Sequence, residues 1–223
     1  MRKLLTALAA LSLAAPAAAQ QHQHGQHHQH GQHHPQGQAH DHSQYPEGWA
    51  VRVDRDAPRD RIWLMDHGGG ELHAATGPAG AVYYHRDWEK TGDYAYSARF
   101  RQPKASPHPE AYGLMIGGKE LAGADQRYSY FLVRQTGEYF IADRKGDTRT
   151  VAANWTAHPA IRKVEGAAGA ENVLGVEVKG SDVVFSVNGQ EVARRPKAEL
   201  STDGLAGFRV NHNLELFIQP QSR

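Results

Sequence analysis

The sequence contains no cysteine, and this absence removes several kinds of site. Without thiols the chain has no disulfide, no thiolate nucleophile and no cysteine-based zinc site. A lipid anchor on an N-terminal cysteine is excluded for the same reason.

An excess of charge of one sign is also missing. The chain has 25 Lys and Arg residues against 24 Asp and Glu residues, which gives a formal net charge of +1. Nucleic-acid-binding surfaces gather basic residues, because much of their affinity comes from the release of counterions around phosphates. The balanced composition therefore argues against a nucleic-acid partner.

Long apolar runs are missing except near the N-terminus. Residues 4–15 are largely apolar, follow the basic pair at 2–3, and are followed by Pro16 and by three alanines at 17–19. The run is shorter than the roughly 20 apolar residues that a membrane-spanning helix needs. This pattern predicts a bacterial-type signal peptide cleaved after Ala19, and hence a periplasmic or secreted protein without membrane insertion.

Several standard motifs are absent as well. The chain has no P-loop, no G-x-G-x-x-G and no G-x-S-x-G sequence. Asp54, Asp56 and Asp60 lie close together, but Arg59 occupies the position where an EF-hand loop requires glycine. We interpret this Arg/Pro-rich stretch as a solvated loop. Calcium bound by scattered loops is compatible with the sequence, but no motif supports it, and no cofactor is required.

What the sequence does have is an unusual concentration of histidine. Residues 20–44 consist almost entirely of His, Gln and Gly, with Asp41 as the only formal charge. Such a segment cannot bury a core, so we expect it to be disordered. It holds nine of the fifteen histidines: His22, His24, His27, His28, His30, His33, His34, His40 and His42.

This histidine-rich tail predicts binding of divalent metal ions. Neutral imidazole is a ligand for Zn, Cu, Ni and Co, and a flexible chain can gather several imidazoles around one ion. Binding should weaken below a pH of about 6.5, because protonated imidazole cannot coordinate. Two alternatives stay open: the tail captures metal in the periplasm, or it is a low-complexity linker without a metal function.

From residue 45 onward the composition is that of a folded domain, which we assign to residues 45–223. It contains all four tryptophans and all the phenylalanines. Period-two alternation dominates: in residues 93–101, Tyr94, Tyr96 and Phe100 share one face. No amphipathic helix is longer than two turns, and only Pro196–Leu200 is expected to form a short helical turn.

Turn signals separate the expected strands. Asn188-Gly189 between apolar runs is a strong hairpin signal, and the turn at 135–137 predicts another. About ten to twelve strands indicate an all-β antiparallel sandwich or barrel. The strands are expected at 61–65, 71–75, 81–85, 93–101, 111–116, 128–134, 138–143, 172–179, 182–187, 190–193, 205–210 and 214–219.

Six short motifs are spaced along this domain: Gly92-Asp93-Tyr94, Tyr112-Gly113-Leu114, Tyr130-Phe131-Leu132-Val133-Arg134, Asn172-Val173-Leu174, Val187-Asn188-Gly189 and Gly204-Leu205-Ala206-Gly207-Phe208. From about Ala81 to Ile218 their order resembles the concanavalin A-like lectin/glucanase jelly roll. Laminin-G-like domains and the bacterial 3-keto-disaccharide hydrolase group are similar. The resemblance implies a jelly-roll β-sandwich whose ligands lie on the concave sheet.

Aromatic and polar side chains in this domain suit a carbohydrate or another small polar ligand. Sugars stack a CH face on an aromatic ring while their hydroxyls meet polar groups. Alternation gives Tyr128, Tyr130 and Arg134 one common face, Tyr139 lies on the paired strand, and Trp155 lies in a loop-like segment. We take these five as candidate ligand contacts, with simple packing of the tyrosines as the alternative.

Three functions compete on these observations. The leading one is non-catalytic carbohydrate binding in the periplasm. The second, implied by the resemblance, is hydrolysis of a glycosidic bond in a 3-keto sugar, with His85, His158 and His212 as candidate general bases. A paired-carboxylate motif of the Glu-x-Asp-x-x-Glu type is absent. The third is a metal-handling protein in which the domain is only a scaffold.

Overall fold

A computed structural model describes residues 45–165 and 167–222. The chain divides into two units, 1–39 and 40–223, and the described residues belong to the second. The expected signal peptide and the nine histidines of the tail lie outside the described residues. Within the described part, no helix has the length and apolarity needed to cross a membrane.

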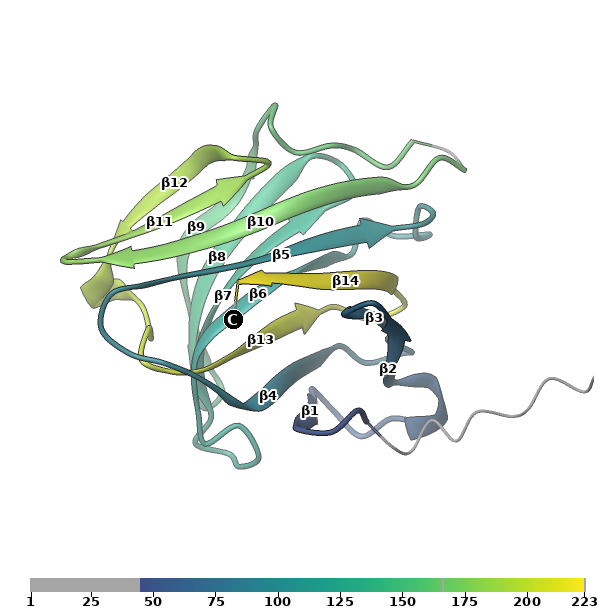
Figure 1. The fold of residues 1–223 in the computed structure, drawn as a ribbon, viewed down its shortest axis with the longest axis horizontal. Helices are drawn as coiled ribbons and strands as arrows, with labels where there is room; N and C mark the ends of the chain where they lie inside the picture. The colour runs from purple at the N-terminus through teal and green to yellow at the C-terminus, as the bar shows by residue number, and fades with distance from the viewer. Residues whose placement is uncertain (1–44, 166, 223) are drawn as a thin grey trace, which may run out of the picture. The chain divides into compact units, whose positions relative to one another are not determined.

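The described residues form fourteen strands in two antiparallel sheets of seven strands each (Figure 1). The first sheet has the order β1 (Trp49–Val53), β4 (Ala81–Lys90), β13 (Gly204–Val210), β6 (Ala111–Lys119), β7 (Arg127–Arg134), β8 (Glu138–Lys145) and β9 (Thr148–Ala157). The second has the order β12 (Gln190–Pro196), β11 (Asp182–Val187), β10 (Ala170–Lys179), β5 (Tyr94–Gln102), β14 (Glu215–Ser222), β3 (Glu71–Ala75) and β2 (Trp63–Gly68).

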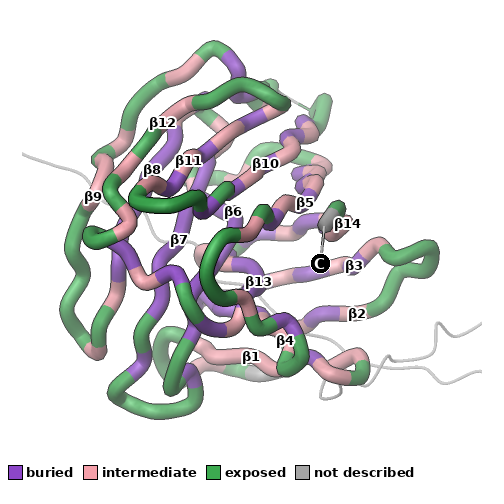
Figure 2. The backbone as a smooth tube through the Cα atoms, turned by 60° about the vertical axis from the view of Figure 1, so that its left-hand side comes forward, coloured by how far each residue is buried: buried purple, intermediate pink, exposed green. Residues whose placement is uncertain are grey.

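The main core lies between the two sheets. Alternation along β5 buries Tyr96, Ala98 and Phe100, as the sequence predicts. Phe131 and Val133 reach the same core from β7 in the opposite sheet. Figure 2 shows this alternation as buried positions recurring along the inner strands, with mostly exposed and intermediate positions along β9. The fold is therefore an antiparallel sandwich, and the all-β prediction is confirmed.

All twelve expected strands are present. The short turn after Pro196 is the 3-10 helix η2 (Lys197–Glu199), and a second such turn, η1 (Arg59–Arg61), precedes β2. Two strands were not expected. One is β1, and the other is β9, which contains Trp155. The prediction of a loop at 154–159 is therefore wrong for residues 154–157.

The hairpin predicted at Asn188-Gly189 joins β11 and β12, and both residues have positive φ angles, 51° and 80°. The Asn188 side chain also donates to the carbonyl oxygen of Ala160 at 2.8 Å and to Oδ1 of Asn172 at 2.9 Å. Asn172 in turn accepts a hydrogen bond from the backbone of Arg162. Two motif asparagines thus anchor the loop that follows β9, which is a structural role.

Candidate functional site

The first sheet carries a second apolar cluster on its outer face, away from the main core. On β7, Tyr128, Tyr130 and Leu132 belong to this cluster, while Phe131 and Val133 belong to the main core. The two tyrosines are nevertheless only 2% and 7% exposed, because neighbouring side chains cover them. The outer face of the first sheet therefore carries an apolar layer of its own, beneath the polar side chains of that face.

A hollow of about 500 Å³ lies over this cluster. Its size falls within the range of sites for small ligands. Strands β7, β8 and β9 provide one part of the lining, including Tyr130, Phe140 and Trp155. Asp54 after β1 and His212 after β13 line it from segments far away in the sequence. We refer to this cavity as the hollow.

Four aromatic rings form a continuous row in the hollow. The ring centroids of Tyr128 and Tyr130 are 5.8 Å apart, and those of Tyr130 and Phe140 are 6.2 Å apart. Phe140 and Trp155 are 5.0 Å apart with an angle of 35° between their planes. The row therefore crosses from β7 through β8 to β9.

An irregularity in β9 brings Trp155 into this row. Tyr139 pairs with Thr156 and Ile141 pairs with Ala153, so Asn154 and Trp155 together stand opposite one β8 residue, Phe140. Such a bulge re-aims side chains locally. Ala153 packs toward the main core, whereas Trp155 packs against the outer cluster. The bulge thus turns Trp155 to the outer face of the sheet.

Arg134 lies over the ring of Trp155. Its guanidinium carbon lies 4.3 Å from the centre of the Trp155 ring, a cation–π contact. The same guanidinium donates to both carboxylate oxygens of Glu138, at 2.8 and 2.7 Å. The hydrogen bond from Arg134, and then one from Thr136, lowers the pKa of Glu138. Arg134 is therefore neutralised and positions Trp155.

Arg209 forms an ion pair with Asp54 at the hollow, and the arginine is the more buried of the two side chains. Nη1 and Nη2 of Arg209 lie 2.6 and 2.5 Å from the two carboxylate oxygens of Asp54. Burial alone would lower the pKa of Arg209, but the hydrogen bonds and charge of Asp54 outweigh it and raise that pKa. Asp54, which we expected in a solvated loop, is therefore a fixed partner of the site.

Polar groups complete the hollow. Glu110 and His212 form a pair with 3.2 Å between Oε1 and Nε2, and Asn154 and Asn211 also line the cavity. Burial raises the pKa of Tyr130, with the charge of Arg149 opposing the shift. The tyrosine hydroxyl is therefore neutral at physiological pH and can both donate and accept hydrogen bonds.

The structure brings together three of the five predicted ligand contacts, Tyr128, Tyr130 and Trp155, and sets Arg134 beside them. It does not bring Tyr139 there. Tyr139 packs in the main core, 6.3 Å from Phe131 between ring centroids, and Phe140 faces the hollow instead. The reason is register: Tyr139 pairs with Val133, so the two share a face.

The three histidines considered as general bases are not brought together. His212 lines the hollow. His85 stacks on Trp88 with 5.0 Å between ring centroids and lines a different cavity. His158 accepts a hydrogen bond at Nδ1 from the backbone of Ala160, in the loop after β9. The three candidate histidines therefore do not line one common cavity.

Sequence reasoning missed several residues of the hollow. Arg144 and Arg149 flank the short turn between β8 and β9, and that spacing is a signal that could have placed them opposite each other. The register of the hairpin between β7 and β8 predicts that Phe140 faces the hollow. No local signal points to Arg209 and Asp54, which are 155 residues apart.

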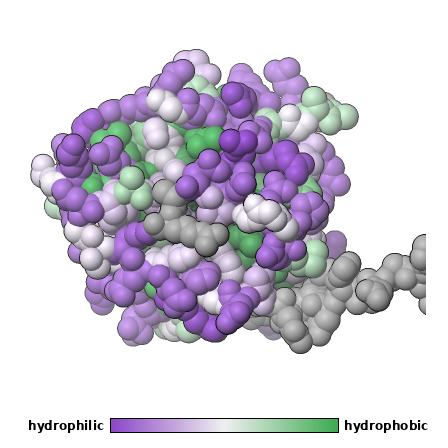
Figure 3. All heavy atoms as spheres, in the orientation of Figure 1, coloured by the Kyte–Doolittle hydropathy of each residue, from purple (hydrophilic) through white to green (hydrophobic). Residues whose placement is uncertain are grey.

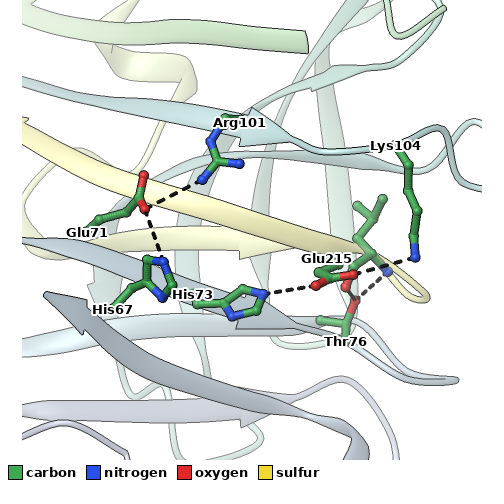
Figure 4. A network of polar contacts seen from close by, with 8 residues as sticks. His67, Glu71, His73, Thr76, Arg101, Lys104 and Glu215 are labelled. Carbon is green, nitrogen blue, oxygen red and sulfur yellow. Dashed lines mark hydrogen bonds and ion pairs between the residues drawn. The ribbon is translucent and has the colours of Figure 1, made fainter. Parts of the chain in front are cut away.

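A second cluster of charged and aromatic side chains lies on strands β2, β3, β5 and β14 of the second sheet (Figure 4). We call it the His/Glu network. Glu71 contacts His67 at 4.0 Å and Arg101 at 3.6 Å. Glu215 contacts His73 at 3.1 Å and Lys104 at 3.7 Å. This face of the molecule is mostly hydrophilic (Figure 3).

This network is not arranged as a metal centre. Among the described residues, no group of three or more histidine or carboxylate side chains is positioned to hold a metal ion. The ring of His73 stacks on Phe217 with 4.2 Å between centroids and is largely covered. Burial lowers the pKa of His73, and the hydrogen bond to Glu215 opposes that shift.

Comparisons with known proteins identify the fold. No protein-family profile matches the sequence, and a search of curated proteins finds no match. Among solved structures, the carbohydrate-binding module CBM66 from Bacillus subtilis is similar, with a TM-score of 0.57 and 13% identity over 77% of this chain and 92% of that one.

Two further structures are similar to this chain. A Bacillus subtilis protein of unknown function with a galectin-like fold gives a TM-score of 0.53 at 13% identity, covering 77% of this chain and 86% of that one. The carbohydrate recognition domain of Emp46p gives 0.50 at 8% identity, covering 78% and 86%. The domain thus has the antiparallel two-sheet sandwich fold of the concanavalin A-like type.

Proposed function

We propose that this protein binds a carbohydrate, without catalysing its conversion, in the hollow on the outer face of the first sheet. The observation that carries the proposal is the row of four rings, from Tyr128 to Trp155, inside a cavity of about 500 Å³. Sugar rings present CH-rich faces that stack on aromatic rings, so a row of rings suits successive sugar units.

The polar lining supports the same ligand class. Asn154, Asn211 and Glu110 provide amide and carboxylate groups beside the aromatic row, and sugar hydroxyls both donate and accept hydrogen bonds. The fold adds support, because a carbohydrate-binding module and a carbohydrate recognition domain share it. A fold alone does not fix function, so the proposal depends on the residues of the hollow.

The test is binding of the full chain to an array of neutral and acidic oligosaccharides, followed by calorimetric titration of the best ligand. Trp155→Ala should weaken binding at least tenfold, because it removes the end of the aromatic row. Trp63→Ala is the matched control, since Trp63 is a partly buried tryptophan on β2 of the other sheet. Loss of binding in the Trp63 variant alone would refute the assignment of the hollow.

For the N-terminal part we propose export and weak binding of divalent metal by the histidines of residues 20–44. This proposal rests on the sequence, because that segment lies outside the described residues. Deleting residues 20–44 should abolish Ni or Zn binding and leave sugar binding unchanged. If metal binding survived the deletion, the tail would not be the metal site.

A further inference from the structure

We infer that the carbohydrate bound in the hollow is anionic, and that Arg144 and Arg149 hold its carboxylate or sulfate group. This inference rests on the proposed function and names its ligand class. It is carried by the placement of these two arginines relative to each other, to the aromatic row and to the acidic residues around them.

The two arginines stand directly opposite each other. Arg144 on β8 pairs with Arg149 on β9, and Tyr128 on β7 pairs with Arg144. Both arginines line the hollow. Opposed residues of an antiparallel pair have Cβ atoms about 5 Å apart, and like charges in that arrangement destabilise the sheet. A repulsive pair in a cavity suggests a ligand that relieves the repulsion.

Nearby acidic groups do little to neutralise this pair. The only ion pair of Arg144 in the described part is with Asp147, at 3.8 Å, and that aspartate is fully exposed. Within the same described part, Arg149 has no carboxylate within 4.0 Å. The two acidic residues that do line the hollow are already engaged, Asp54 by Arg209 and Glu110 by His212.

The position of the pair along the row sets the orientation of the ligand. Arg144 lies in register with Tyr128, at one end of the aromatic row, and Trp155 lies at the other end. Two guanidinium groups can together donate several hydrogen bonds to one carboxylate or sulfate, and such charge-assisted bonds are about twice as strong as neutral ones. The guanidinium of Arg149 lies 5.8 Å from the centre of the Phe140 ring. The ligand therefore places its acidic group between Tyr128 and Phe140 and stacks its sugar rings toward Trp155.

The experiment compares matched ligand pairs by calorimetric titration of the full chain. The carboxylate pair is a galacturonic acid tetrasaccharide and its carboxyl-reduced counterpart. The sulfate pair is a sulfated tetrasaccharide of the heparin type and its desulfated counterpart. In at least one pair the acidic member should bind about tenfold more tightly than the neutral one, which also tells the two acidic groups apart.

The variant is Arg144→Gln together with Arg149→Gln, and its preference for the acidic member should fall to near parity. The control is Arg194→Gln together with Arg195→Gln on β12, which removes the same charge from exposed residues of the other sheet. The control should keep the full preference. Thermal unfolding verifies folding, and removal of the repulsive pair should leave the midpoint unchanged or raised.

Three results overturn the inference in distinguishable ways. If neutral and acidic members bind equally, and Trp155→Ala abolishes binding of both, the anionic ligand is refuted and the carbohydrate site stands. If no oligosaccharide on the array or in the pairs binds, both the inference and the proposed function fail. An acidic preference that persists in the Arg144/Arg149 variant refutes the role of these two residues.

Discussion

The outer faces of the two sheets are built from similar parts but differ in how their charges are matched. The first has Arg134 over Trp155, and the second has Arg101 over Phe217 at 3.9 Å. Cavity size does not separate them, because a cavity of about 510 Å³ lies beside the His/Glu network. That cavity has one aromatic side chain in its lining, Trp63, whereas the hollow has four.

Charge matching is the sharper difference. In the His/Glu network each basic side chain has a carboxylate within 4.0 Å, so the polar groups of the cluster are matched without a ligand. In the hollow, Arg149 lacks such a partner within the described residues and faces Arg144. An aromatic ring with a nearby cation thus occurs on the outer face of both sheets. What points to a ligand is the unmatched charge of Arg149 beside the row of rings.

The largest effect should come from the aromatic floor of the hollow. Phe140→Ala removes a side chain that is only 6% exposed, so unfolding free energy should fall by about 3 kcal/mol. Phe217→Ala is the equivalent change in the second sheet, at a partly exposed position, and should cost about 1 kcal/mol. Urea unfolding measures both. Equal losses of unfolding free energy would show that the outer cluster contributes no more to stability than the aromatic contacts of the His/Glu network.

The next effect compares the two kinds of ion pair. Asp54→Ala leaves Arg209, whose side chain is 14% exposed, without its partner, and should destabilise the protein by about 2 kcal/mol. Glu71→Ala removes a carboxylate from exposed partners and should cost less than about 1 kcal/mol. Urea unfolding at neutral pH provides the measurement. A cost for Asp54→Ala no larger than that for Glu71→Ala would contradict this ranking.

A smaller effect of opposite sign is expected at the arginine pair. Arg149→Gln removes the like charge opposite Arg144, so the unliganded protein should gain about 0.5 kcal/mol. Arg194→Gln removes a guanidinium that contacts Glu191 at 2.8 Å and should give no gain. Thermal unfolding at low salt, where charge repulsion is least screened, separates the two variants. A destabilised Arg149→Gln protein would mean that the contacts of Arg149 with Tyr130 and Phe140 outweigh its repulsion by Arg144.

How far the sequence predicted these regions depends on the regularity of each strand. Alternation in β5 and β7 is unbroken, so the core faces of Phe100 and Phe131 could be predicted. In β9 two register shifts interrupt the alternation, and the strand therefore resembles a loop in the sequence. The residue type of Trp155 marks it as a candidate ligand contact. No signal in the sequence predicts the bulge that turns it into the hollow.

Tyr139 illustrates a signal that was available. Alternation assigns Val133 to the core, and the turn at 135–137 sets Tyr139 opposite Val133, so Tyr139 had to face the core as well. The same argument across the turn after Lys145 pairs Arg144 with Arg149. The contact between Asp54 and Arg209 differs in kind, because it joins distant segments and depends on the complete strand order of the first sheet.

The smallest expected effect concerns pH in the His/Glu network. Burial lowers the pKa of His73 below its ordinary value of 6.5, although the hydrogen bond and charge of Glu215 oppose the shift. The unfolded chain therefore takes up a proton at this residue before the folded one does. Stability contributed by neutral His73 is complete above a pH of about 6.5 and is lost as pH falls through the folded pKa.

His73→Gln removes this titration while keeping a side chain that can donate to Glu215. The unfolding free energies of wild type and variant are measured at pH 8, 6.5 and 5.5. As pH falls, the wild type should lose more stability than the variant. His67→Gln is the control, because the ring of His67 is 54% exposed. A difference that moved in favour of the wild type at pH 5.5 would mean that Glu215 outweighs burial. The three guanidinium groups that line the hollow, those of Arg144, Arg149 and Arg209, keep their charge over this whole range, so the titration of His73 tests the second sheet without changing them.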